Sequence, residues 1–254
     1  MQSVILAAGR GSRMKSLAID KPKCLLELAG KTILDWQIDA LLGSGIQRIT
    51  LITGYKAEKL ISKSFDTIYN TKWSKSNMLR TLICANHILE QHTVLISYAD
   101  IVYHIAWIKN LMKAEGDIVI TYDQLWEDLW RLRFNNPLSD AESFAQSEGR
   151  LLDIGRKTND LSEIQGQYMG LIKLTPNGWK KIQSVLYHLT EDQIDSVDMT
   201  ALFQILLNHD IIIKTIPIRG RWCELDSEND LNVYNKKIAE RSKTDSMWKH
   251  DWRN

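Results

Sequence analysis

The sequence predicts an α/β fold in which helices cover a mostly parallel sheet. Short apolar runs alternate with longer segments of helical periodicity along the first half of the chain. This alternation is typical of parallel sheets, because two parallel strands need a long crossover connection, which is usually a helix. The strands expected from it are 3–7, 48–53, 66–69, 93–97, 168–174 and 211–217, and the helices are 33–43, 57–63 and 76–89.

Length and composition limit the possible classes of protein. The chain has 254 residues, of which 44% are hydrophobic, and this is enough to bury a substantial core. Lys and Arg number 32 against 31 Asp and Glu, so the chain has no broad basic field and we expect no nucleic-acid partner. We recognise no signal peptide and no apolar run of about 18 residues, so we expect no membrane association and a cytoplasmic location. The 3 cysteines have no close pairing, which argues against a disulfide framework and a structural zinc site.

Residues 1–235 are expected to form a single domain, and residues 236–254 a charged C-terminal tail. Trp248 and Trp252 lie one helical turn apart in this tail. We expect the tail to pack as a C-terminal helix or to assist association.

The most informative segment is residues 4–13, where an apolar strand runs into a loop of glycine and arginine. Small side chains let backbone N–H groups approach a base or a polyphosphate closely, and cations neutralise phosphates. An ordinary turn with solvated basic residues is the alternative, but the lysine that follows Pro22 adds a further cation and favours a phosphate site. The small residues are Ala7, Ala8, Gly9 and Gly11, and the cations are Arg10, Arg13 and Lys23.

Three acids are candidates for a cation site. Asp100 ends an apolar strand, and Glu224 and Asp226 share one face of a later strand because side chains two apart point the same way. Mg²⁺ is usually held by one or two carboxylates together with phosphate oxygens. We therefore predict Asp100 and Asp226 as ligands of Mg²⁺ and Glu224 as a helper or an outer residue. The alternative for each acid taken alone is a surface charge or a helix cap.

These parts suit nucleotidyl transfer better than hydrolysis. An incoming phosphate attacks the α-phosphorus of a nucleoside triphosphate, pyrophosphate leaves in line, and the protein positions two anions and neutralises the spreading charge. Arg13 and Lys23 are predicted as the catalytic residues that do this with the metal. No general base is needed, because the attacking oxygen is already ionised near neutral pH.

A family resemblance extends this interpretation. Residues 6–13, Lys21-Pro22-Lys23 and residues 28–34 resemble the signature of the sugar-nucleotidyltransferase superfamily, which implies a Rossmann-like nucleotidyltransferase core. Within it the chain is similar to the small cytidylyltransferases of the phosphocholine type, through residues 54–56, 77–82, 100–103 and 222–226.

The resemblance implies residue roles. Leu6, the 7–11 backbone and Gly54 would hold base and ribose, Arg13 and Lys23 the phosphates, and Asp100 the nucleotide through Mg²⁺, shared with Asp226. Asn77 would lie beside the nucleotide or the acceptor phosphate, although a helix cap is the alternative role for Asn77.

The phosphorylated acceptor is expected to bind in an insertion of about residues 122–167, for which irregular surface loops are the alternative. Trp126 and Trp130 could form an aromatic wall there, although core packing is the commoner role of such a pair. Tyr168 aligns with the choline-type segment in which an acid precedes tyrosine, but Gln167 replaces the acid and disfavours a simple trimethylammonium.

Residues 97–103, parts of 129–142 and residues 198–200 are instead similar to the cytidylyltransferases that activate phosphoglutamine for phosphoramidate decoration of bacterial capsules. An amino-acid acceptor needs partners for its carboxylate and its ammonium. The candidates for the carboxylate are Arg133 and Lys157, and those for the ammonium are Glu163 and Asp198.

The predicted function is therefore Mg²⁺-dependent transfer of CMP from CTP to a small phosphorylated amino compound, with L-glutamine phosphate ahead of phosphocholine and 2-aminoethylphosphonate. A sugar-1-phosphate nucleotidyltransferase and a nucleotide-binding module without catalysis are the alternatives. The superfamily also implies a possible homodimer.

Overall fold

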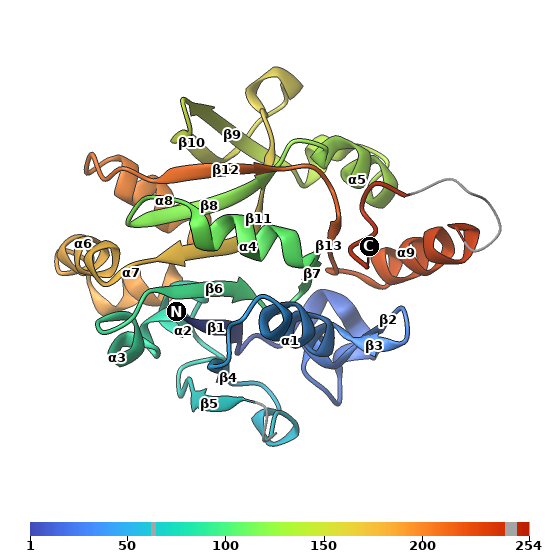
Figure 1. Ribbon diagram of the computed structural model, residues 1–254, viewed down its shortest axis with the longest axis horizontal. Coiled ribbons are helices and arrows are strands. Elements are labelled where there is room, and N and C mark those ends of the chain that lie inside the picture. The colour runs from blue at the N-terminus through green and yellow to red at the C-terminus, as the bar shows by residue number, and fades with distance from the viewer. Residues whose placement is uncertain (62–64, 242–247, 254) are drawn as a thin grey trace.

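The strand that precedes the glycine loop lies inside a nine-stranded sheet (Figure 1). The computed structural model describes residues 1–61, 65–241 and 248–253. The sheet runs from β5 at the bottom of Figure 1 to β10 and β9 at the top. In spatial order its strands are β5 (Asp66–Tyr69), β4 (Ile49–Thr53), β1 (Gln2–Ala7), β6 (Val94–Tyr98), β11 (Gln167–Leu174), β8 (Ile118–Asp123), β12 (Lys214–Ile218), β10 (Arg150–Lys157) and β9 (Glu142–Ser147).

The sheet is mixed but largely parallel, which confirms the predicted fold class. β1 pairs in parallel with β4, where Ile5 lies opposite Leu51, and with β6, where Ile5 lies opposite Ser97. β4 with β5 and β8 with β12 are also parallel, whereas β11 and β10 run antiparallel to their neighbours. The carboxyl ends of β1, β4, β5 and β6 consequently lie at one edge, where ligands gather in sheets of this kind.

Successive side chains of β1 point to opposite faces of the sheet, and each face has its own hydrophobic cluster. Ile5 and Ala7 belong to one hydrophobic cluster, while Val4 and Leu6 belong to the other. The first cluster takes in buried residues of α1 (Ile33–Gly43), α4 (Ile105–Lys113), α5 (Trp126–Arg133) and α9 (Glu228–Arg241). The second takes in those of α2 (Met78–Ile83), α3 (Asn86–Leu89), α6 (Pro176–Leu186), α7 (Glu191–Ser196) and α8 (Met199–Leu207).

Two short ladders complete the fold. β2 (Glu27–Leu28) pairs with β3 (Lys31–Thr32), and β7 (Ile101–Tyr103) pairs antiparallel with β13 (Trp222–Glu224). In the second ladder Glu224 lies opposite Ile101, and the Leu225 N–H donates to the Asp100 carbonyl at 2.9 Å. This pairing brings the last strand of the chain to the end of β6.

Several predicted elements agree with the structure and others are shorter. The helix expected at 33–43 is α1, begun by Thr32, whose hydroxyl accepts from the Asp35 N–H at 3.0 Å. The helix expected at 76–89 is divided into α2 and α3, because the backbone of Ala85 departs from helical geometry between them. Of the helix expected at 57–63, only a 3₁₀ turn at Ala57–Lys59 forms, and residues 62 and 63 lie outside the described residues.

The stretch at about 122–167, expected to be an insertion, contains α5, the β9–β10 hairpin at the sheet edge, and 3₁₀ turns at Pro137–Ser139 and Leu161–Glu163. The expected boundary between residues 235 and 236 falls inside α9. Residues 248–253 form turns rather than the expected helix, and Trp252 packs edge-on against Trp36 at 5.9 Å. The rest of that tail, residues 242–247 and 254, lies outside the described residues. In the described part of the chain, no helix is long and apolar enough to cross a membrane.

The core of the second cluster can be tested at Phe203, which is 1% exposed. Phe203→Ala is expected to lower the free energy of unfolding by about 3–5 kcal/mol, because it removes a buried ring and leaves a cavity. Urea denaturation followed by circular dichroism measures the change. Tyr187→Ala is the matched control, since Tyr187 is 86% exposed, and it should stay within about 0.5 kcal/mol of the wild type. Equal losses in both variants would contradict the described packing.

Candidate active site

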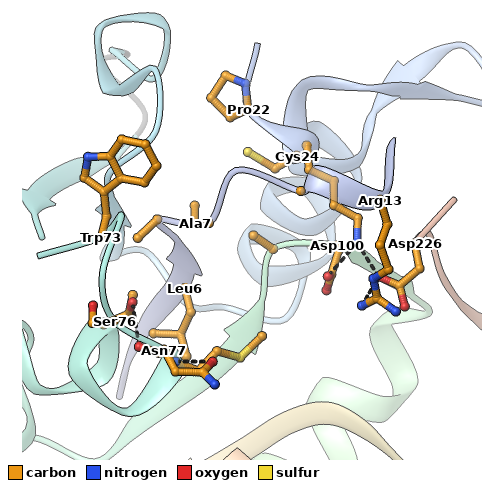
Figure 2. Close-up of a pocket in the computed structure, with 17 residues that line it drawn as sticks. Leu6, Ala7, Arg13, Pro22, Cys24, Trp73, Ser76, Asn77, Asp100 and Asp226 are labelled. Atoms are coloured by element: carbon orange, nitrogen blue, oxygen red, sulfur yellow. Dashed lines mark hydrogen bonds and ion pairs between the residues drawn. The ribbon is translucent and has the colours of Figure 1, made fainter. Parts of the chain in front are cut away.

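A pocket of about 250 Å³ opens at the carboxyl ends of β1 and β6 (Figure 2). It contains both the glycine loop and two of the three predicted acids. Its lining is formed by Leu6, Ala7, Ala8, Gly9, Gly11, Arg13, Pro22, Lys23, Cys24, Trp73, Ser76, Asn77, Met78, Thr81, Ala99, Asp100 and Asp226.

Charged groups meet at one end of this pocket. Lys23 Nζ donates to Asp100 Oδ2 at 2.9 Å and to Asp226 Oδ1 at 2.5 Å, and an Arg13 Nη donates to the same Asp226 oxygen at 3.1 Å. Figure 2 shows Arg13, Asp100 and Asp226 together on one side, with Trp73 and Asn77 on the other. Two cations and two acids that are far apart in the sequence therefore converge, as the sequence predicted.

Local backbone geometry places these side chains. Gly11 has a φ of +66°, in the left-handed region that favours glycine, and it precedes the 3₁₀ helix Ser12–Ala18 that carries Arg13. A Cβ on Gly11 would lie 3.0 Å from Lys23 Cβ. The missing side chain thus lets Lys23 pack directly on the loop.

The three predicted metal ligands form one group, which we call the acidic cluster (Asp100, Glu224 and Asp226). One carboxylate oxygen from each lies within 4.8 Å of the others. Oxygen donors of this kind suit a hard divalent cation such as Mg²⁺, so the residues fit the predicted metal. A bound Mg²⁺ would neutralise phosphate charge here.

Burial and neighbouring charges shift the pKa values of Glu224 and Asp226 in opposite directions. Burial, and then repulsion by Asp226, raises the pKa of Glu224 well above its ordinary value. Burial would also raise the pKa of Asp226, but Lys23, followed by Arg13 and Arg133, holds it well below its ordinary value. Burial opposes the charge on Lys23, yet Asp100 and Asp226 raise its pKa. Lys23 and Asp226 therefore remain an ion pair over the whole neutral range.

The other end of the pocket is less polar and is formed by the end of β1 with the segment after β5. Trp73 and Thr81 line it, and sequence analysis did not single them out. The available signal for Trp73 was its place a few residues after β5, at the carboxyl edge of the sheet, whereas Thr81 lies within α2 and has no such signal. Asn70 is buried and its side-chain amide donates to the Thr81 hydroxyl at 3.2 Å, which fixes the start of this segment.

Two predicted nucleotide contacts lie outside the lining. A Cβ on Gly54 would lie 2.5 Å from Trp73 Cβ and 2.6 Å from the Ala8 carbonyl oxygen. The missing side chain of Gly54 therefore lets Trp73 and Ala8, which line the pocket, pack close together. Arg10 is exposed, and its guanidinium lies 5.6 Å from the ring centre of Tyr55. Tyr55 in turn meets Trp73 edge-on at 5.5 Å.

Asn77 has the cap role that was considered for it, and it also lies in the pocket wall. It caps α2, because its side-chain oxygen accepts from the Met78 N–H at 2.8 Å, and it also lines the pocket. Its side-chain amide donates to the Ser196 carbonyl at 3.2 Å, which ties α2 to the last residue of α7.

Three predicted acceptor contacts lie in the core. Trp126 and Trp130 are 4% and 3% exposed and meet edge-on at 5.9 Å, so their packing follows the alternative considered for this pair. The Arg133 side chain is fully buried and is ion-paired with Glu224, Asp226 and Asp230. These placements give a direct acceptor contact no support.

The other predicted acceptor contacts surround the start of β11. Tyr168 meets Tyr98 edge-on at 5.7 Å, at the end of the strand that leads to Asp100. Gln167 is buried, and its side chain bonds both the N–H and the carbonyl of Glu142. Asp198 is exposed and caps α8. Lys157 and Glu163 are also exposed, and Lys157 Nζ donates to the Asp140 carbonyl at 3.1 Å.

Comparison with known proteins defines the class. The chain belongs to the MobA-like NTP transferase family, whose domain model matches residues 3–152. It is accordingly a nucleotidyltransferase, which confirms the predicted enzyme class.

Within this class the chain is 35% identical to the CTP:phosphoglutamine cytidylyltransferase of Campylobacter jejuni subsp. jejuni serotype O:2, over 92% of this chain and 98% of that protein. The 2-aminoethylphosphonate cytidylyltransferase of Lancefieldella rimae is 30% identical over 39% of this chain and 43% of its own length. The resemblance to cytidylyltransferases is thereby confirmed.

Solved structures share the fold. The inositol-1-phosphate CTP transferase from T. maritima matches with a TM-score of 0.74, over 92% of this chain and 95% of that chain at 18% identity. The CTP:phosphocholine cytidylyltransferase from Streptococcus pneumoniae matches with a TM-score of 0.69, over 93% and 98% at 18% identity.

The ion pairs of Lys23 lead to a test of the acidic cluster. Lys23→Met removes the ammonium from between Asp100 and Asp226, so we expect the protein alone to bind Mn²⁺ more tightly than the wild type does. Turnover should fall about a hundredfold or more, because the phosphates lose a charged partner. Electron paramagnetic resonance measures free Mn²⁺, and Lys31→Met is the control, since Lys31 is exposed and pairs with Asp39 at 2.7 Å. Unchanged Mn²⁺ binding in Lys23→Met would show that the ammonium does not compete with the cation.

Proposed function

We propose that the protein is a Mg²⁺-dependent cytidylyltransferase that transfers CMP from CTP to a small phosphorylated amino compound, with L-glutamine phosphate as first choice. The observation that carries the proposal is the convergence of Arg13, Lys23, Asp100 and Asp226 in one pocket beside the glycine loop, with Glu224 next to the two aspartates. Binding a nucleotide without reaction does not require this full set of charges.

In the proposed reaction an ionised phosphate oxygen of the acceptor attacks the α-phosphorus of CTP. A new P–O bond forms while the bond from the α-phosphorus to the bridging oxygen breaks, and the electron pair leaves with pyrophosphate. Arg13 and Lys23 turn from Asp226 toward the phosphates and neutralise the charge that spreads in the transition state. Asp100 and Asp226, with Glu224 beside them, would hold Mg²⁺, which supplies further positive charge.

The less polar end of the pocket, formed by the end of β1 and the segment after β5, would bind the nucleoside. Ala7, Ala8 and Gly9 expose backbone groups there, and Trp73 offers an aromatic face beside them. Leu6 and Asn77 would contact the base or ribose from the opposite wall, while Gly11 lets Lys23 pack on the loop, from where Lys23 would meet the phosphates. CTP as the nucleotide is supported by the similarity to the Campylobacter jejuni enzyme.

An acidic region near β11 supports an amino group on the acceptor. The pKa of the Tyr98 phenol is raised first by burial, then by Tyr168, and further by the charges of Asp100 and Asp198, so both carboxylates act on this ring. Glu142 lies in the same region, where burial raises its pKa, the charge of Lys157 lowers it and the charge of Asp198 raises it again. A phosphate held at the cluster would therefore direct an ammonium group over Tyr98 and Tyr168 toward Asp198.

The remaining acceptor contacts follow from this orientation. Of the two candidates for the carboxylate, Lys157 is exposed, whereas Arg133 is fully engaged by acids. Glu163, whose nearest cation is Arg156 at 3.7 Å, is a weaker candidate than Asp198 for the ammonium. A phosphoglutamine product would serve phosphoramidate decoration of a capsule, and the reaction would take place in the cytoplasm.

The direct experiment incubates the protein with CTP, Mg²⁺ and each candidate acceptor and measures pyrophosphate. L-Glutamine phosphate is expected to be the best acceptor, ahead of phosphocholine and 2-aminoethylphosphonate. Sugar 1-phosphates with UTP or dTTP form the comparison set. Release only with a sugar 1-phosphate would contradict the proposal, and CTP binding in calorimetry without any product would favour a module that binds nucleotide alone.

Asp198 provides a test of acceptor orientation. Asp198→Asn is expected to raise the KM of the acceptor about tenfold or more while leaving the KM of CTP unchanged, because only the ammonium loses a charged partner. Steady-state kinetics with each substrate varied in turn measures both values. Asp210→Asn is the control, since Asp210 is exposed in the turn after α8 and its left-handed φ of +57° suits asparagine. Equal effects on both KM values would place Asp198 outside the acceptor site.

A further inference from the structure

Arg133, the last residue of α5, has a completely buried side chain that serves three carboxylates. One Nη donates to Glu224 Oε2 at 3.1 Å, and the other donates to Asp226 Oδ2 at 3.3 Å. Nε and the second Nη also donate to the two oxygens of Asp230, at 3.2 and 3.3 Å. The planar fork of arginine makes this possible, whereas a lysine ammonium has a single nitrogen.

The guanidinium is itself held in place. It lies 5.1 Å from the ring centre of Trp130 and 5.0 Å from that of Phe134. The Asn229 side-chain amide donates to the Arg133 carbonyl at 3.0 Å, so α9 also fixes the backbone at the end of α5. Trp130 is 3% exposed, so the guanidinium packs against a buried ring.

Asp226 is shared between the pocket and Arg133. Its Oδ1 accepts from Lys23 and Arg13, while its Oδ2 accepts from Arg133. Asp230 Oδ2 accepts from the backbone N–H groups of Asp226 and Ser227, at 2.8 and 2.9 Å. Arg133 and Asp230 therefore hold both the side chain and the backbone of Asp226, and one carboxylate oxygen is left directed at Lys23.

We propose that Arg133 is a positioning residue of the acidic cluster: it orients Glu224 and Asp226 so that the cluster can bind a divalent cation with the nucleotide. The proposal rests on the metal site of the proposed function, but not on the identity of the acceptor. It gives Arg133 a role in the reaction different from the acceptor contact expected from the sequence.

The test replaces Arg133 by lysine, which keeps the charge and loses the fork. Mn²⁺ is titrated into the protein alone and with CTP, and bound metal is measured by electron paramagnetic resonance. Arg133→Lys is expected to weaken Mn²⁺ binding about tenfold or more, because outer residues of metal sites act at this scale. The KM of the acceptor should stay unchanged. Arg131→Lys is the matched control on the same helix, since Arg131 is 58% exposed and pairs with Glu127.

Two outcomes would overturn the proposal. A variant that melts at a lower temperature but binds Mn²⁺ like the wild type while folded would show a purely structural role. A raised acceptor KM with unchanged Mn²⁺ binding would return Arg133 to the acceptor site. Thermal denaturation by circular dichroism, recorded on the same samples, separates loss of folding from loss of metal binding.

A second variant covers the case in which Arg133→Lys does not fold. Asp230→Asn keeps the shape of the side chain and removes one charged partner of the guanidinium, so it should weaken Mn²⁺ binding in the same direction, and unchanged binding would contradict the proposal. If only the proposed function fails, no acceptor gives pyrophosphate with the wild type. Mn²⁺ binding by the protein alone should still be weaker in Arg133→Lys and Asp230→Asn than in the wild type. A wild type that binds no Mn²⁺ in either condition would overturn the proposal at its premise.

Discussion

The pairing of β13 with β7 is the constraint on which the site depends. It lays residues 222–224 against residues 101–103 and bonds the Leu225 N–H to the Asp100 carbonyl. The two strands are more than a hundred residues apart in the sequence. Their pairing brings Asp100 close to Glu224 and Asp226, so that one cation could contact all three carboxylates. Without this ladder the glycine loop would face Asp100 alone.

The charges in the site are balanced by cations of two kinds. Arg133 is fully buried and bonded on several sides, so it has little freedom to move. Lys23 and Arg13 are joined to the cluster from the pocket side, and the Arg13 side chain is 67% exposed. In the proposed function a triphosphate would compete for the second kind but not for the first. The proposal thus assigns the maintenance of the geometry to one cation and contact with the substrate to the two others.

Much of the site was predictable because it follows local rules. The strand that ends in small residues, the cations of the loop and the acid at the end of β6 are all set by the position of strand ends in a parallel sheet. Helix α1 was likewise predictable, since its apolar spacing begins and ends with clear capping signals.

The rest depended on tertiary contacts that spacing does not reveal. Trp126 and Trp130 have the spacing of a binding wall and of a core stripe alike, and only the packing of α5 against the first cluster decides between them. Arg133 is a plausible anion ligand in sequence, but its partners lie about ninety residues away, at Glu224, Asp226 and Asp230. Trp73 enters the pocket through a turn after β5, where no periodic pattern marks it.

The C-terminal segment has a consequence for how activity can be lost. The Arg221 N–H donates to the Lys249 carbonyl at 2.8 Å, the Cys223 thiol donates to the His250 carbonyl at 3.5 Å, and a Cβ on Gly220 would lie 2.4 Å from the Lys249 oxygen. Lys249 and His250 thus pack against β13 and the turn before it. Proteolytic trimming or a premature stop codon near residue 248 would loosen the strand that carries Glu224, and so silence the enzyme while every residue lining its pocket is still present.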